Sequence, residues 1–235
     1  MRESPVPSRF VLRTSGLRLR PEGSGPFPLL VALHGWGMTV PGFRDLMVPA
    51  LPEGWALLVP EGVLPVEVDA VGKRRIGRAW YAYDGDQAGF RAWLEAGNRH
   101  VMRLVRAEAA RPEIDRRRVH LLGYSQGAYL AGFTAFHHPR DFAGLVLAAG
   151  RLKHEFVADR LARAGHLRTL LVTGARDASL PRDRLEEGRN ALERAGVPVE
   201  ALEHPGGHGL TRDALQGIRA WLERSPTARG ASRPG

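Results

Sequence analysis

A serine flanked by glycines lies where an apolar run meets a run of small residues, and this junction constrains the fold more than any other stretch. The segment is Gly123-Tyr124-Ser125-Gln126-Gly127, between apolar residues 119–122 and the small-residue stretch 128–135. The first run predicts a buried strand and the second a helix. A G-x-S-x-G turn between them needs glycines, because side chains there would collide with neighbouring elements. We therefore expect Ser125 to be an exposed nucleophile at a helix N-terminus.

An acidic residue follows this serine in the chain, directly after another strand-like run. Asp177 comes after apolar residues 169–172 and before Pro181, which is typical of the start of a helix. Ligand sites of parallel sheets lie at the carboxyl ends of their strands, so a carboxylate here can orient an imidazole and stabilise its cation. A turn-capping role is the alternative for Asp177. Asp183 is the second candidate for the acid, although it lies within the next predicted helix.

The candidate base is His208, in the glycine-rich segment His204-Pro205-Gly206-Gly207-His208-Gly209. Flexible glycines allow the imidazole to fold back over the serine. A neutral imidazole can accept the hydroxyl proton and return it to a leaving group. His204 precedes a proline at a strand end, so we interpret it as structural. The chain order serine, aspartate, histidine matches nucleophile-elbow enzymes and differs from chymotrypsin and subtilisin.

An oxyanion intermediate would need two backbone N–H groups aimed at its negative charge. Gln126 follows the nucleophile and supplies one, assisted by the dipole of the helix behind it. The loop His34-Gly35-Trp36-Gly37 follows the apolar run 29–33 and supplies the second, for which we choose Trp36. An ordinary strand-end turn is the alternative for this loop. We interpret His34 as a packed, hydrogen-bonded residue and not as a second base.

Strand-like and helix-like segments alternate along the chain, which predicts an α/β fold with a mainly parallel sheet covered by helices on both faces. One or two antiparallel edge strands are expected within residues 9–20. The other predicted strands are 29–33, 56–59, 119–122, 145–147, 169–172 and 199–202, and the predicted helices are 41–51, 87–111, 128–135, 155–163, 182–195 and 210–222. We expect one domain, residues 1–223, and a disordered Arg-, Ser-, Pro- and Gly-rich tail, residues 224–235.

Residues 61–87 show no clear periodicity and contain five glycines or prolines, which predicts a long loop. A loop of that length in a compact domain is usually functional or mobile. No large insertion between the later strands could form a helical lid. A lipase that is activated at an interface is therefore not expected.

Composition limits the classes of protein that remain. The chain has no cysteine, which excludes disulfides, a thiolate nucleophile and cysteine-ligated metals. Residues 1–10 are too polar for a secretory leader, and no run reaches the roughly 18 apolar residues of a membrane helix. We expect a cytoplasmic protein without membrane insertion, either a monomer or a homodimer.

The formal net charge of +9 raises nucleic acid or an anionic membrane as a partner. Most of this charge comes from the two ends of the chain, since residues 21–223 hold 26 basic and 24 acidic side chains. The basic clusters 73–75 and 116–118 lack the interleaved aromatic residues that stack on bases. We therefore expect no nucleic-acid partner.

Five segments within residues 27–223 resemble, in order and spacing, the carboxylesterase/phospholipase branch of the α/β-hydrolases, which includes acyl-protein thioesterase-like enzymes. They are His34-Gly35-Trp36-Gly37, Arg78-Ala79-Trp80-Tyr81-Ala82-Tyr83, Gly123-Tyr124-Ser125-Gln126-Gly127, Gly174-Ala175-Arg176-Asp177 with Pro181, and Gly207-His208-Gly209. The resemblance implies the α/β-hydrolase fold and a Ser-His-Asp triad. It also implies hydrolysis of small-molecule carboxylic esters or thioesters through an acyl-enzyme, without a cofactor.

Substrate contacts are expected from the loop 61–87 and from residues near the three catalytic candidates. We choose Met38, Trp80, Tyr81 and Leu180, together with the side chain of Trp36. Ordinary core or surface packing is the alternative for each of them.

A metal site is not expected. Four residues match the spacing of a calcium-binding loop, namely Asp84, Asp86, Gly89 and Glu95. However, Ala88 stands at a ligand position and a helical pattern begins too early, so we interpret the match as coincidence.

Other functions stay open. The same triad can serve acyl transfer or the hydrolysis of peptide or C–C bonds, because fold and triad do not determine the substrate. A non-catalytic binding protein on this fold would not need to retain Ser125, Asp177 and His208 in register. A basic nucleic-acid or membrane-surface protein would show salt-dependent binding that survives removal of both Arg-rich ends.

Overall fold

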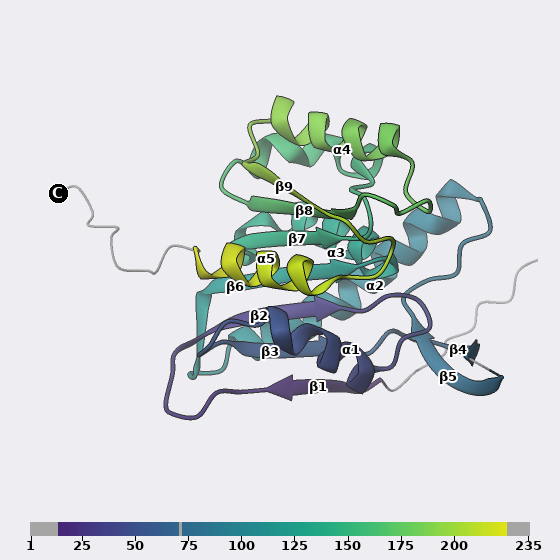
Figure 1. Cartoon of the computed structure of the whole chain (residues 1–235). Helices are drawn as coiled ribbons and strands as arrows, with labels where there is room; N and C mark the ends of the chain where they lie inside the picture. The colour runs from purple at the N-terminus through teal and green to yellow at the C-terminus, as the bar shows by residue number, and fades with distance from the viewer. Residues whose placement is uncertain (1–13, 71, 225–235) are drawn as a thin grey trace, which may run out of the picture.

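The computed structural model describes residues 14–70 and 72–224, and its centre is a twisted seven-stranded sheet (Figure 1). The strand order is β1-β3-β2-β6-β7-β8-β9. β1 pairs antiparallel with β3, and every other neighbouring pair in this sheet is parallel. The strands are β1 Gly16–Leu19, β2 Phe27–Leu33, β3 Ala56–Pro60, β6 Ile114–Tyr124, β7 Gly144–Ala148, β8 Arg168–Gly174 and β9 Val199–His204.

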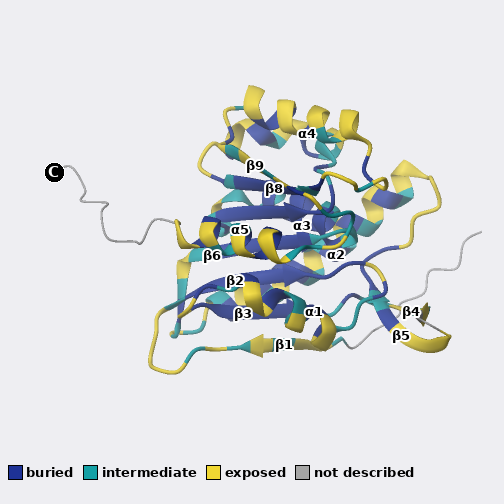
Figure 2. Ribbon diagram, in the orientation of Figure 1, coloured by how far each residue is buried: buried dark blue, intermediate teal, exposed yellow. Residues whose placement is uncertain are grey.

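Helices cover both faces of the sheet, and two hydrophobic cores result (Figure 2). The helices are α1 Val40–Met47, α2 Gln87–Ala109, α3 Gln126–His137, α4 Arg182–Arg194 and α5 Arg212–Glu223. Successive strand residues point to opposite faces. In β2, Leu29 and Val31 join the core formed with α2 and α3, whereas Leu30 and Ala32 join the core formed with α1 and α5. The strands are buried on both sides, which explains their uninterrupted apolar runs.

The close contact of α3 with the sheet depends on its small residues. Ala128, Ala131 and Ala135 are fully buried, and Gly132 lies against Leu147. Larger side chains at these positions would push the helix away from β6 and β7. The run of small residues thus places the start of α3, and with it Ser125, at the carboxyl end of β6.

The predicted fold class and the predicted parallel strands are confirmed, with two differences among the helices. Residues 41–51 form α1 and then a short 3₁₀ turn, Val48–Ala50. Residues 155–163 do not form one α-helix, which corrects our prediction. They lie in two 3₁₀ segments, His154–Phe156 and Ala158–Arg163. Val157, between them, has φ −134° and ψ 11°, outside the α-helical region.

The prediction of a long loop at residues 61–87 is wrong for most of that segment. Residues Leu64–Ala70 (β4) and Lys73–Ala79 (β5) form an antiparallel hairpin outside the main sheet. In β4, half-buried Val66 and Val68 alternate with exposed Glu67 and Asp69, which is the two-residue period of a strand. This alternation is short and lies among glycines and a proline, which are typical of a loop, so the sequence pattern did not predict the hairpin.

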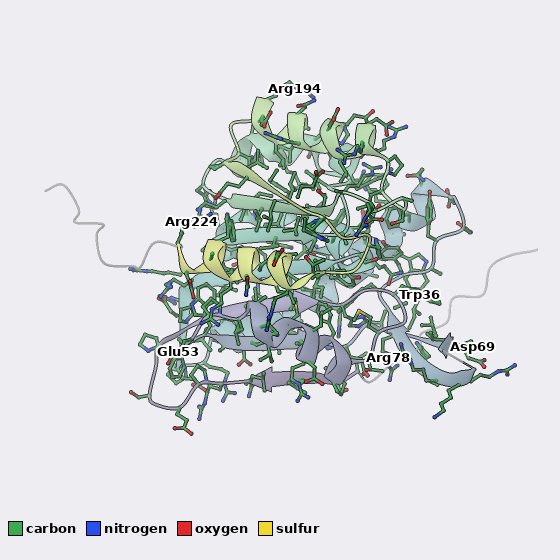
Figure 3. The ribbon with its side chains drawn as sticks, in the orientation of Figure 1. Trp36, Glu53, Asp69, Arg78, Arg194 and Arg224 are labelled. Atoms are coloured by element: carbon green, nitrogen blue, oxygen red, sulfur yellow. The ribbon has the colours of Figure 1, made fainter. Side chains whose placement is uncertain are left out.

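The hairpin packs on the loop that contains Trp36. The N–H of Gly37 donates to the carbonyl of Arg78 at 2.8 Å, and the N–H of Arg78 donates to the carbonyl of Met38 at 3.0 Å. A Cβ atom on Gly77 would overlap the backbone of Gly37, so this contact requires glycine. Figure 3 shows Trp36 beside the hairpin.

The two ends of the chain are only partly described. Of the edge-strand region 9–20, residues 9–13 lie outside the described residues, and of the remaining residues Gly16–Leu19 form β1. Of the tail predicted at 224–235, the structure describes only Arg224, which ends α5 and donates to Glu200 at 2.7 Å. No helix among the described residues has the length and apolar character that crossing a membrane requires.

A histidine is buried in the core between the sheet and α5. The ring of His120 on β6 lies 4.9 Å from that of Trp55 and 6.3 Å from that of Trp221. Its Nδ1 donates to the carbonyl of Arg118 at 3.3 Å. Burial lowers the pKa of His120 to about 4. The folded protein therefore keeps this imidazole neutral under mildly acidic conditions.

We expect the free energy of unfolding to fall as the pH drops from about 6.5 to about 4, because the unfolded chain binds a proton that folded His120 excludes. The contribution of His120 across this window is about 3 kcal/mol. His120→Asn keeps a donor near Nδ1 and removes the titration. Urea unfolding between pH 7 and pH 5 should show a smaller loss of stability in the variant. Equal losses in both proteins would contradict this role.

Candidate active site

Ser125 occupies a strained turn between β6 and α3. Its backbone has φ 52° and ψ −117°, and its N–H donates to the carbonyl of Ala148 at 2.8 Å. A Cβ atom on Gly123 would overlap the carbonyl of Gly127, and one on Gly127 would overlap the carbonyl of Leu33. Both glycines are therefore required by close backbone contacts, as the sequence pattern predicts.

The structure brings Ser125, His208 and Asp177 together. Ser125 Oγ lies 2.8 Å from His208 Nε2, and His208 Nδ1 lies 2.8 Å from Asp177 Oδ2. The side chain of Asp177 is 2% exposed and that of His208 is 41% exposed. The alternative acid, Asp183, lies on α4 with an exposed side chain that pairs with Arg184 at 3.9 Å. Asp177 is thus the carboxylate that faces the imidazole.

Two loops that follow β8 and β9 hold this arrangement. The N–H of Arg176 donates to the carbonyl of Gly206 at 2.9 Å. A Cβ atom on Gly174 would overlap the carbonyl of Gly207, so the two loops are in direct backbone contact. The hydroxyl of Tyr124 donates to the carbonyl of His208 at 3.1 Å. These contacts fix the backbone that carries the imidazole.

The charge state of Asp177 determines which nitrogen of His208 carries a proton. Burial opposes ionisation of this carboxyl, but the hydrogen bonds from Ser179 and His208 outweigh it and hold the pKa of Asp177 below its ordinary value. An ionised carboxylate only accepts hydrogen bonds. The Nδ1 of a neutral His208 must therefore carry the proton, which leaves Nε2 free to accept the proton of Ser125.

Ser179, which no motif in the sequence indicated, contacts both Asp177 and His208. Its hydroxyl donates to Asp177 Oδ1 at 2.6 Å, and its oxygen lies 2.9 Å from His208 Nδ1. Its backbone N–H also donates to Asp177 Oδ1, at 3.0 Å. A serine two residues after a candidate acid is a possible local signal, because serine and aspartate form such turns readily.

Both candidate oxyanion donors lie near Ser125. Gln126 follows Ser125 in the chain. A Cβ atom on Gly35 would come 3.3 Å from Ser125 Cβ, so the loop that carries Trp36 passes directly beside Ser125. Within residues 14–70 and 72–224, neither the N–H of Trp36 nor that of Gln126 donates a hydrogen bond. Both groups are available to an anion, and the helix dipole of α3 adds to the positive potential at Gln126.

His34 has a structural role, as the sequence analysis expects. It is fully buried, its Nε2 accepts from the N–H of Gly62 at 3.0 Å, and its Nδ1 donates to the carbonyl of Gly35 at 2.7 Å. Burial lowers the pKa of His34. The neutral ring thus ties the start of the loop that carries Trp36 to the segment after β3.

The side chain of Gln126 fastens a second loop to the site. Its Oε1 accepts from the N–H of Trp80 at 2.8 Å, and its Nε2 donates to the carbonyl of Tyr81 at 2.9 Å. Trp80 itself is 1% exposed, and its indole N–H donates to the carbonyl of His34 at 2.8 Å. Trp80 therefore packs in the core, which corrects its selection as a substrate contact.

The other residues chosen as substrate contacts lie in different parts of the structure. Trp36 is 54% exposed and lies beside the hairpin. Met38 is half-buried, and its backbone forms an isolated antiparallel β-bridge with that of Arg78. Leu180 lines a cavity of about 250 Å³ between Asp177 and α4. Tyr81 lines a different cavity, on the α2 side of α3.

The residues with calcium-like spacing belong to the start of α2. Asp86 caps this helix by accepting from the N–H groups of Ala88 and Gly89 at 3.1 and 2.8 Å. The N–H of Asp86 donates to Asp84 at 3.0 Å. Across the described residues, no three His, Asp or Glu side chains form a group that could hold a metal ion.

Comparison with known families and structures gives consistent results. A model of the phospholipase/carboxylesterase family matches residues 21–225. Acyl-protein thioesterase 2 from Zea mays is similar over 91% of this chain and 99% of its own, with a TM-score of 0.72 and 19% identity. The carboxylesterase from Bacillus cereus is similar over 90% and 94%, with a TM-score of 0.68 and 19% identity. A search of curated proteins gives no match.

We expect Ser179→Ala to raise the pKa of Asp177, because the variant loses the side-chain hydrogen bond that favours the carboxylate. The titration can be followed by the carboxyl ¹³C resonance of Asp177. Ser179→Thr retains a hydroxyl and is the matched control, with a pKa close to that of the parent protein. An unchanged pKa in Ser179→Ala would show that the remaining contacts of Asp177 suffice.

Proposed function

The chain belongs to the phospholipase/carboxylesterase family and is a hydrolase, and on this premise we propose that it cleaves carboxylic esters or thioesters with Ser125, His208 and Asp177 as its catalytic triad. The observation that carries the proposal is the pair of 2.8 Å contacts that links the three side chains. Their order along the chain and the strained turn at Ser125 support the same assignment.

In the first half-reaction, His208 Nε2 takes the proton of Ser125 as its Oγ attacks the carbonyl carbon of the ester. The imidazolium that forms is stabilised by ionised Asp177. The same proton then passes to the leaving alcohol or thiol as its bond to the acyl carbon breaks. The product of this step is an acyl group on Ser125.

The negative charge that develops on the carbonyl oxygen would be stabilised by the N–H groups of Trp36 and Gln126. Their lack of other hydrogen bonds among the described residues supports this role. The loop of Trp36 is held by the β4–β5 hairpin and by His34, which supports a donor that is in position before substrate binds.

In the second half-reaction, a water molecule replaces the alcohol. His208 removes its proton, the hydroxide attacks the acyl carbon, and the bond to Ser125 Oγ breaks as Oγ regains the proton. Free acid and the original enzyme result. The scheme uses no cofactor.

The same geometry also suits reactions other than ester hydrolysis. Acyl transfer and hydrolysis of a peptide or C–C bond would use the same three side chains, and the cavity around Ser125 selects among them. The cytoplasmic location, the oligomeric state and the absence of a nucleic-acid partner stay predictions.

We expect Ser125→Ala to lose labelling by a fluorophosphonate probe and to lower kcat for p-nitrophenyl esters by about 10⁶-fold, because the attacking oxygen is gone. The variant should keep the circular dichroism spectrum and melting temperature of the parent. A folded variant that still turns over esters would remove Ser125 from the mechanism.

We expect Asp177→Asn to lower kcat by about 10⁴-fold, because an amide favours the wrong tautomer of His208. Asp183→Asn is the matched control, since this exposed carboxylate on α4 pairs with Arg184 and has no described contact with the imidazole, and it should leave kcat unchanged. The opposite ranking of the two variants would identify Asp183 as the acid.

A further inference from the structure

A cavity of about 260 Å³ opens on the α2 side of Ser125. It is lined by four aromatic and two cationic side chains, namely Tyr81, Tyr83, Phe90, Tyr129, Arg151 and Lys153. The mechanism above uses none of them. Ligand sites usually measure about 300–1,000 Å³, so a cavity of this size suits a small group.

Three observations place this cavity near Ser125. Tyr129 lies on α3, four residues after Ser125. The hydroxyl of Tyr81 donates to the carbonyl of Gln126 at 3.4 Å. A Cβ atom on Gly150 would come 2.9 Å from the carbonyl oxygen of Ser125, and Arg151 follows directly. Residues that line the cavity, or their direct neighbours, therefore contact the backbone of Ser125 and Gln126.

The walls of the cavity are aromatic. The ring of Phe90 lies 4.8 Å from that of Tyr81, 5.0 Å from that of Tyr83 and 6.1 Å from that of Tyr129. Such walls cover methylene groups well. Burial raises the pKa of Tyr81 and Tyr129, so both hydroxyls keep their protons. The Tyr81 hydroxyl donates its proton to the carbonyl of Gln126, which leaves the Tyr129 hydroxyl as the donor for an anion.

The far side of the cavity carries a positive charge. The side chains of Arg151 and Lys153 are 12% and 14% exposed, and both donate to one carboxylate, Glu155. Burial opposes ionisation of Glu155. The hydrogen bonds and charge of Arg151, together with the hydrogen bond from Lys153, outweigh burial and lower the pKa of Glu155 to about 2. Two cations against one anion leave a net charge of +1.

Lys153 can donate further hydrogen bonds. Its ammonium group carries three donors, and within the described part of the chain its only hydrogen bond goes to Glu155 Oε1, at 3.2 Å. The ammonium also lies 5.1 Å from the centre of the Phe156 ring. Arg151, by contrast, has both terminal nitrogens committed to Glu155, and one of them also donates to the carbonyl of Leu152.

We propose that this cavity holds an acyl group with a carboxylate at its far end, so that the preferred substrates are half-esters or half-thioesters of short dicarboxylic acids. The inference rests on the ester-cleaving function proposed above. Lys153 would bind the carboxylate, and the aromatic walls would cover the methylene chain. A purely alkyl chain would instead desolvate two cations without pairing their excess charge. Lys153 is thereby a specificity-determining residue.

The chemistry is that of the triad and balances with water alone. Ser125 Oγ forms a bond to the ester carbon of the half-ester, the leaving alcohol departs with the proton from His208, and water then releases the free dicarboxylic acid. The distal carboxylate takes no part in bond making. It remains an anion throughout.

The test compares phenyl hydrogen adipate with phenyl 6-methylheptanoate, in which an isopropyl group replaces the carboxylate at nearly the same size. The measured quantity is the ratio of kcat/KM for the charged over the neutral ester. We expect Lys153→Met to lower this ratio about tenfold or more, as loss of a charged hydrogen bond does. Lys153→Arg keeps the charge and should retain most of the preference.

Arg91→Met is the matched control. Arg91 also lies over the Phe156 ring, at 5.8 Å, but it is paired with Glu95 and does not line the cavity. Its substitution should leave the ratio unchanged. Competitive inhibition by free adipate gives a second readout, and it should weaken in Lys153→Met and not in Arg91→Met.

The outcomes separate this inference from the proposed function. A wild-type protein that cleaves the neutral ester through Ser125, with a ratio that Lys153→Met does not change, would overturn the inference and keep the esterase. Preference for phenyl benzoate over both esters, insensitive to Lys153, would also overturn it in favour of an aromatic acyl group. Absence of any ester cleavage and of fluorophosphonate labelling would instead overturn the proposed function.

Discussion

The turn at Ser125 is the constraint on which the rest of the site depends. Its backbone is held at φ 52°, a region that residues other than glycine rarely adopt. The conformation persists because β6 and α3 are both buried and because Gly123 and Gly127 allow backbone atoms to touch. The strain is thus maintained by the packing of the whole sheet. In return, Ser125 Oγ stands at the carboxyl edge of the sheet, where the other loops converge.

Those loops are fastened to one another mainly by backbone hydrogen bonds. The contacts between 174–176 and 204–207 hold His208 against Asp177, and the β4–β5 hairpin holds Gly37 and Met38. Ser179 adds a side-chain contact to both members of the acid–base pair. An arrangement of this kind positions proton donors and acceptors before substrate binds, which is how electrostatic preorganisation lowers a barrier.

The cavity beside Ser125 differs chemically from the core that surrounds it. The core is aliphatic and aromatic, whereas the cavity combines aromatic walls with Arg151 and Lys153. Both cations come from the segment directly after β7, whose first residues touch the carbonyl of Ser125. The same short segment therefore contacts the turn at Ser125 and supplies both cations of the cavity.

Local patterns in the sequence determined the sheet, the turn and the three candidate catalytic residues. Apolar runs such as 29–33 and 170–172 mark buried strands because burial on both faces favours apolar residues. Glycines around Ser125, Asp177 and His208 mark turns for a similar local reason, and so these features were readable from neighbouring residues. The hairpin 64–79 was missed because its alternation is short and interrupted by glycine.

Only the tertiary structure decided which distant residues meet. Ser125 and His208 are 83 residues apart, and Gln126 reaches Tyr81 across 45 residues. Such contacts depend on the order of strands in the sheet, which no local pattern records. The same is true of Trp80, whose indole N–H reaches the carbonyl of His34 across 46 residues, and of Lys153, which lines one cavity with Tyr81 and Phe90. The sequence by itself thus determined the chemistry available, and the packing of the sheet decided where that chemistry meets a substrate.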